Sequence, residues 1–147
     1  MKLKERLTKK ENIEEWLIKN LIGMGEIAIM YAPPDHHKTG MALKIAMEVI
    51  TGGMDMGKSQ TGKVLFYNLD TPVLKMDTRA KALMENSYLD HLDQIGLNLD
   101  IREHDINLTD NHWAKRDSLV ITWKDLGIHH RNDGFKLIII DTLSKVL

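Results

Sequence analysis

The stretch from Gly25 to Gly53 constrains the fold of this chain more than any other. An apolar run, Ile27–Tyr31, has the length of a buried strand and lies between a glycine and a pair of prolines. From Met41 onward, apolar residues recur at three- and four-residue spacing, which predicts a helix ending at the glycine pair 52–53. A strand, a loop and a helix in this order aim the helix's first N–H groups and positive dipole end at the loop. We therefore expect ligand chemistry in the loop.

The loop resembles a phosphate-binding loop in part. Its residues are Ala32, Pro33, Pro34, Asp35, His36, His37, Lys38 and Thr39, and Gly40 follows. Against the pattern G-x-x-x-x-G-K-[ST], Lys38 and Thr39 fit, whereas Ala32 and His37 replace the two glycines. Glycine tolerates positive φ, and a non-glycine residue held there costs about 1–3 kcal/mol. Histidine tolerates the left-handed conformation better than most residues, which allows the loop to persist in altered form.

Composition limits the chain to one domain and points to no particular partner. Its 147 residues, 43% of them apolar, can bury a single core. A net charge of −1 predicts no overall basic surface for nucleic acid or an anionic membrane, although a local basic groove stays open. The lack of cysteine excludes disulfides, thiol nucleophiles and cysteine-based zinc sites, and suits a cytoplasmic protein. No apolar run approaches the ~20 residues of a membrane span, so we expect no membrane association.

The N-terminal part divides into a basic tail and a predicted helix. Residues 1–11 form the tail, whose charges favour a solvated segment over a phosphate-seeking arm. Asn12 can cap a helix over 12–21, with an apolar face that packs on the edge of a sheet or, alternatively, docks a partner. The residues on that face are Ile13, Trp16, Leu17 and Leu21.

The rest of the chain alternates between strand and helix patterns, which indicates an α/β protein with a mainly parallel sheet. The expected elements are a loop over 55–62, a strand over 63–69, a helix after Pro72, a short half-exposed strand over 95–101, a helix over 110–126 and a strand over 135–141. The last strand has four consecutive large aliphatic residues before Asp141, which predicts a central parallel strand covered on both faces.

Three polar strand ends form the candidate site. Ligands bind outside the carboxyl ends of parallel strands, so Lys38-Thr39, Asp70 and Asp141 could converge. Lys38 would then neutralise phosphate charge, Thr39 and Asp141 would hold Mg²⁺, and Asp70 would orient or deprotonate the attacking water. The alternative is that both aspartates only terminate strands.

For two other groups of side chains, the sequence favours a structural role over metal binding or stacking on bases. The histidine pairs 36–37 and 129–130 lack the spacing of metal ligands. Tyr67, Trp113 and Trp123 fall on apolar faces, which favours the core over stacking on nucleic-acid bases.

The order and spacing of these segments resemble a known ATPase core. Residues 16–34 look like the entry to the core of RecA-like proteins, specifically the RepA-like hexameric helicase group of AAA-family ATPases. The ending of the first helix at 50–53 is similar to the one that follows their Walker A motif. Residues 64–70 resemble their second strand, with Asp70 in place of a catalytic glutamate. Residues 135–147 resemble their Walker B strand, with Asp141 at the metal-linked carboxylate.

The resemblance implies a RecA-like P-loop NTPase fold of three layers, of which residues 12–147 form the N-terminal portion. In that family a strand expected beyond residue 147 lies between the P-loop strand and the Walker B strand, so the fold would be incomplete. The implied activity is ATP hydrolysis with Mg²⁺ in a homo-oligomeric ring, with single-stranded DNA as partner. Lys38 and Asp70 would be catalytic, residues 32–40 would bind ATP, and Thr39 and Asp141 would bind the metal.

Two other functional classes stay open. The replaced glycines and Asp70 favour a degenerate, non-hydrolysing nucleotide-binding or protein-interaction module. A regulatory protein that docks through the helix over 12–21 is the third possibility, and it requires an exposed apolar helix face.

Overall fold

The computed structural model describes residues 2–8, 16–33, 37–103, 106–107, 119–120 and 133–142. Its helices are α1 (Leu3–Thr8), α2 (Lys38–Thr51), α3 (Val73–Ser87), the 3₁₀ turn η2 (Leu89–His91) and α4 (Leu92–Asn98). Its strands are β1 (Trp16–Ile18), β2 (Ile22–Gly23), β3 (Lys63–Asn68), β4 (Leu99–Arg102), β5 (Ile106–Asn107), β6 (Leu119–Val120) and β7 (Phe135–Asp141).

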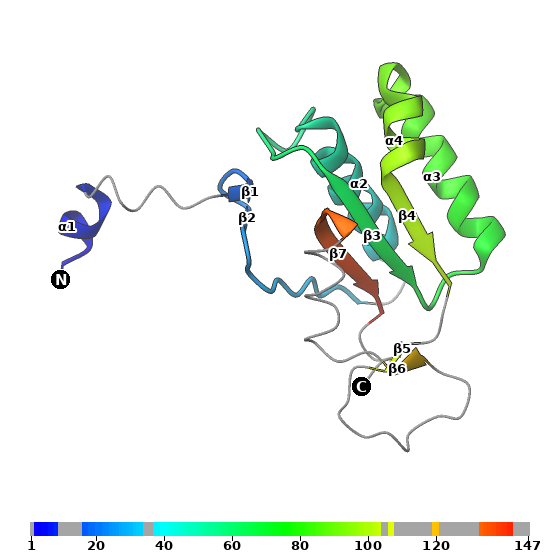
Figure 1. The fold of residues 1–147 in the computed structure, drawn as a ribbon, viewed down its shortest axis with the longest axis horizontal. Helices are drawn as coiled ribbons and strands as arrows, with labels where there is room; N and C mark the ends of the chain where they lie inside the picture. The colour runs from blue at the N-terminus through cyan, green and yellow to red at the C-terminus, as the bar shows by residue number, and fades with distance from the viewer. Residues whose placement is uncertain are drawn as a thin grey trace.

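A three-stranded parallel sheet in the order β4-β3-β7 forms the centre of the fold (Figure 1). Its register pairs Phe66 with Ile101 of β4 and with Ile139 of β7. Helices α3 and α4, with the turn η2 between them, connect β3 to β4, as parallel pairing requires, and α2 precedes β3 in the chain. The α/β class predicted from the sequence is therefore confirmed, and the sheet is that of a partial P-loop NTPase fold.

Side chains of β3 alternate between two apolar clusters. Val64 and Phe66 join a large core with α2, whereas Leu65 and Tyr67 join a smaller cluster with Phe135 on the other face. These four side chains of β3 are completely buried. The central strand among the described strands is therefore β3. The sequence predicted β7 to be central, but β7 pairs only with β3 among the described strands.

The elements with regular apolar spacing formed as predicted. Helix α2 ends at Gly52, which adopts the left-handed C-cap conformation at φ 86°. Helix α3 follows Pro72 directly, and β3 and β7 cover the two apolar runs. The strand expected over 95–101 is shorter, because Ile95 lies in α4 and the strand begins at Leu99.

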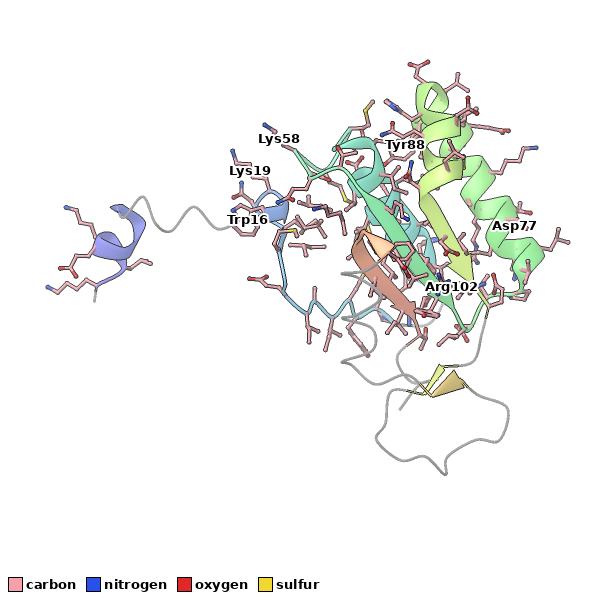
Figure 2. The ribbon with its side chains drawn as sticks, in the orientation of Figure 1. Trp16, Lys19, Lys58, Asp77, Tyr88 and Arg102 are labelled. Carbon is pink, nitrogen blue, oxygen red and sulfur yellow. The ribbon has the colours of Figure 1, made fainter. Side chains whose placement is uncertain are left out.

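The helix predicted over 12–21 is wrong for its described part. Residues 16–18 instead form β1, which pairs antiparallel with β2 through a turn in which Asn20 has φ 63°. The backbone of β1 and of the turn after it also hydrogen-bonds to a loop distant in the sequence. Gln60 N donates to Leu17 O at 2.9 Å, and Lys19 N donates to Lys58 O at 2.9 Å. Figure 2 shows Trp16, Lys19 and Lys58 on the same side of the molecule. The hypothesis of a regulatory protein that docks through a helix over 12–21 is therefore not supported by residues 16–21.

The apolar run Ile27–Tyr31 was also predicted incorrectly, since it forms no strand. Ile27, Ile29 and Tyr31 are 81%, 78% and 89% exposed. A strand needs a neighbour to hydrogen-bond, and no described strand pairs with this run. Strand composition alone could not supply that neighbour.

Part of the predicted helix over 110–126 is a strand. Leu119 and Val120 form β6, which pairs in parallel with β5. The other residues of that helix, including Trp113 and Trp123, lie outside the described residues, as does the histidine pair 129–130. Tyr67 is fully buried, which confirms its predicted place in the core.

A buried carboxylate fixes α2 to the loop that follows it. Glu48 is fully buried and accepts hydrogen bonds from the backbone N–H groups of Met54 (2.9 Å), Asp55 (2.6 Å) and Met56, and from the Tyr88 hydroxyl (3.0 Å). Burial by itself raises the pKa of Glu48, but these hydrogen bonds outweigh burial and hold the pKa below its ordinary value of 4.5. Burial, followed by the hydrogen bond to Glu48, raises the pKa of Tyr88 above its ordinary range. The C-terminal half of α2 is thus anchored by an ionised group.

Candidate functional site

The candidate site begins where α2 begins. Lys38 is the first helical residue, and His37 before it has φ 59° and ψ 30°, which is the left-handed region. This is the position where the phosphate-loop pattern has its second glycine, and histidine adopts the positive φ in its place. His37 makes no side-chain cap, and the first turn of α2 carries no acidic residue. The first turn of α2 therefore contributes no carboxylate of its own to the positive dipole end of the helix.

Thr39 and Asp141 come together from distant parts of the chain. The Thr39 hydroxyl donates to Asp141 Oδ2 at 2.8 Å across a separation of 102 residues. Thr142 donates to the other carboxylate oxygen at 2.9 Å, and Asp141 is 8% exposed. The structure thus unites two of the three predicted polar strand ends in one contact.

Asp70 is not part of that contact. It lies in the turn after β3, is exposed, and has no hydrogen bond or ion pair within the described part of the chain. The turn itself is ordered by Asn68, whose side chain accepts from Thr71 N at 3.1 Å and donates to Thr71 O at 2.7 Å. Asp70 therefore stands at the carboxyl end of β3 on a fixed turn, with its carboxylate in solvent.

Asn68 and Glu103 belong to the same edge of the sheet, and the sequence analysis missed both. Asn68 pairs in register with Asp141, is 3% exposed, and donates to Glu103 Oε2 at 2.8 Å. Glu103 directly follows β4, so the carboxyl ends of all three strands carry a polar side chain. A polar residue at the end of an apolar run predicts a site residue at the edge of the sheet. At the end of β3 this rule selects Asp70, although Asn68 is the residue that pairs with Asp141.

The other predicted site residues lie around the start of α2. Lys38 and Gly40 are half-buried in its first turn, and Ala32 and Pro33 precede it in a segment without regular structure. The side chain of Lys38 has no ion-pair or hydrogen-bonding partner among the described residues. Pro34, Asp35 and His36 lie outside the described residues.

The described residues contain no group of three or more histidine, cysteine or acidic side chains arranged to hold a metal by themselves. A cation at this site would therefore need oxygen ligands from a bound molecule or water besides those of Thr39 and Asp141. Among the described residues there is also no helix long and apolar enough to cross a membrane.

Comparison with known proteins gives one match. A family model described as an AAA domain matches residues 3–147, nearly the whole chain. No curated protein and no solved structure matches the chain. The matched family is one of nucleotide-binding domains of the ATPase type, in agreement with the α/β fold and with the loop before α2.

Proposed function

The chain belongs to the AAA domain family, and on this basis we propose that it binds ATP with Mg²⁺ at the start of α2 and hydrolyses it. The observation that carries the proposal is the 2.8 Å hydrogen bond between Thr39 and Asp141. The contact brings a hydroxyl at the start of a helix and a carboxylate at the end of a parallel strand to one point, although they lie 102 residues apart in the sequence.

The donor set fits Mg²⁺. This ion prefers hard oxygen ligands and keeps several waters, so that a protein supplies one or two groups and the substrate phosphates supply more. Thr39 Oγ1 and Asp141 Oδ2 are such oxygens and already lie within contact of each other. When bound, the ion would neutralise charge on the phosphate oxygens. Holding it would be the role of Thr39 and Asp141.

The phosphates would bind at the N-terminus of α2. Its first N–H groups and dipole attract an anion, and the side chain of Lys38 is not engaged by any described residue. His37 in the left-handed conformation supports this proposal, because it gives the backbone the bend that glycine gives in the usual loop. Residues 32–40 would together form the cradle.

Asp70 is our candidate for the residue that orients the attacking water. Its carboxylate is exposed at the carboxyl end of β3, one strand from Asp141. General-base assistance of this kind contributes about 10²–10⁴-fold to a rate. The wider role, by resemblance to RepA-like helicases, is that of a ring-forming motor domain acting on single-stranded DNA.

A second candidate function is a non-hydrolysing nucleotide-binding or interaction module. The feature that favours it is the pair of replaced glycines, Ala32 and His37, together with an Asp70 that contacts no described residue. A nucleotide-binding module would share nucleotide binding by α2 with the first function and differ from it only in turnover, whereas an interaction module would bind no nucleotide.

Titration calorimetry with ATP and Mg²⁺ tests the proposed nucleotide binding. We expect the wild-type chain to bind and Lys38→Ala to lose at least about tenfold in affinity, which corresponds to ~1.4 kcal/mol. Lys75→Ala, which removes an exposed charge from α3, is the matched control and should bind as the wild type does. No binding by a chain whose circular dichroism shows it folded would refute the proposal. Phosphate release by the same samples then separates the hydrolysing function from the module.

A further inference from the structure

The carboxyl edge of the sheet carries a row of three polar side chains on the face that packs against α2. Side chains of a strand alternate between its two faces, so a residue two positions after a core residue lies on the same face. On each strand of the sheet, the residue two positions before the polar one belongs to the core around α2. The three polar residues are Glu103 directly after β4, Asn68 at the end of β3 and Asp141 at the end of β7. The row therefore extends from the end of β4 to the carboxylate that contacts Thr39.

Every polar atom of the Asn68 side chain is hydrogen-bonded. Its Oδ1 accepts from Thr71 N at 3.1 Å, and its Nδ2 donates to Thr71 O at 2.7 Å and to Glu103 Oε2 at 2.8 Å. An asparagine NH₂ group has two hydrogens, so both are used, and Asn68 is buried. The bond to Glu103 is assisted by the charge of the carboxylate, which makes it stronger than a bond between neutral groups. Asn68 is thus held in one orientation between the turn after β3 and the end of β4.

The turn that follows β3 is held from two directions. On one side, Leu69 N donates to Asp141 O of β7 at 2.7 Å. On the other side, Asn68 hydrogen-bonds to both backbone polar groups of Thr71. Asp70 lies between Leu69 and Thr71, and its own carboxylate makes no hydrogen bond or ion pair within the described part of the chain. The position of Asp70 therefore depends on the backbone of this turn.

We propose that Asn68 and Glu103 are positioning residues for hydrolysis, which hold the turn so that Asp70 reaches the attacking water. Asn68 acts through the backbone of Thr71, and Glu103 acts through Asn68. A base must lie within hydrogen-bonding reach of the proton that it removes, and a misplacement of about 1 Å can cost about 10²-fold in rate. This inference rests on the hydrolysis proposed above, and it assigns a role in that reaction to two residues that the proposal does not use.

The test measures kcat and KM for Mg²⁺-dependent phosphate release from ATP, together with the ATP affinity of each variant by calorimetry. We expect Asn68→Ala to lower kcat roughly 10- to 100-fold and Glu103→Ala roughly 3- to 10-fold, with KM and ATP affinity changed less than about twofold. Glu103→Gln should keep most of the rate, because its amide oxygen still accepts from Asn68. The control Gln94→Ala removes a partly buried hydrogen bond of 2.8 Å to Ile50 O, at the end of α2 opposite to Thr39. It should lower stability without lowering kcat.

Two double variants show whether these residues act through Asp70. Asn68→Ala combined with Asp70→Asn should be no slower than Asp70→Asn alone, and Glu103→Ala should cost nothing further when added to Asn68→Ala. If the losses multiply instead, the residues act independently of Asp70 and the inference is refuted. An equal loss of kcat in Gln94→Ala would also refute it, because the effect would then be one of stability.

The measurements also separate this inference from the proposed function. If kcat falls in Asp70→Asn but not in Asn68→Ala or Glu103→Ala, the hydrolysis stands and the positioning role is refuted. If the wild type binds ATP but releases no phosphate, the positioning role is refuted and nucleotide binding stands. If the folded wild type binds no ATP, both proposals fail. Thermal unfolding shows whether each variant is folded, and the side chain of Glu103 is exposed, so Glu103→Ala against Glu103→Gln decides the matter even if Asn68→Ala does not fold.

Discussion

Replacing Glu48 by glutamine tests the claim that an ionised, buried carboxylate holds α2 in place. Each carboxylate oxygen accepts two hydrogen bonds: Oε2 from Met54 N and the Tyr88 hydroxyl, and Oε1 from Asp55 N and Met56 N. A glutamine has only one such oxygen, and its NH₂ group would face donors at the other position.

The better orientation of the glutamine places NH₂ toward Tyr88, whose hydroxyl can turn to accept. Met54 N then loses its acceptor, which costs about 1–3 kcal/mol for a buried donor, and the remaining hydrogen bonds lose the charge that strengthens them. We expect Glu48→Gln to lower the free energy of unfolding by about 2–4 kcal/mol and the melting temperature by roughly 5–15 °C.

Urea unfolding followed by circular dichroism measures this difference, and pH gives a second check. The pKa of Glu48 is lower in the folded chain than its ordinary 4.5, so its stabilisation is present above pH 4.5 and is lost as the pH falls below that value. The difference between the wild type and Glu48→Gln should therefore shrink on acidification. The control Glu85→Gln breaks an exposed pair with Lys81 at 3.8 Å and should change stability by no more than about 0.5 kcal/mol. A glutamine variant as stable as the wild type at pH 7 would contradict the reasoning.

Five further substitutions bear on the site. Asp141→Asn should remove the dependence of ATP affinity on Mg²⁺, measured by calorimetry with the metal and with a chelator, because one of the two oxygen ligands loses its charge. Asp70→Asn should lower the rate of phosphate release by about 10²-fold or more while leaving ATP binding intact. Glu103→Gln, at the neighbouring strand end, should lower that rate less. A larger loss in Glu103→Gln than in Asp70→Asn would assign the role of general base to Glu103. Gly40→Ala should raise the melting temperature by a few degrees, since alanine gains about 1 kcal/mol over glycine in a helix and its added carbon meets no atom within 4 Å. His37→Gly should retain or increase ATP affinity, because glycine adopts the left-handed conformation without strain; a large loss would assign the imidazole a direct role in binding.

Local periodicity was sufficient for the elements that pack along their whole length. In α2 and α3 the apolar residues recur at helical spacing, and in β3 and β7 they form unbroken runs, so packing and propensity agree. These elements carry Thr39, Asp141 and Asp70 to one end of the sheet. The site could therefore be placed from the sequence as far as its strand and helix ends.

The predictions that were wrong concern segments whose structure depends on hydrogen-bonding partners far away in the sequence. The residues of β1 have an apolar pattern that fits a helix, but their backbone hydrogen-bonds to residues 58–60, which no local rule indicates. The run Ile27–Tyr31 has strand composition, yet strand formation depends on a neighbour. Glu48 lies within the predicted helix, and nothing local shows that three backbone N–H groups later in the chain donate to its carboxylate.

The replaced glycines determine which residues adopt positive φ in the loop, and other parts of the molecule fix the position of the N–H groups at the start of α2. Glu48 anchors the C-terminal half of α2, and the hydrogen bond from Thr39 to Asp141 ties its first turn to β7. The helix is thus held at both ends, and its N–H groups keep their place relative to the sheet whichever residues precede them. His37 has only to turn the chain into the helix, which it does at φ 59°. The helix N-terminus that we propose as the anion site is therefore held in place by contacts outside the loop.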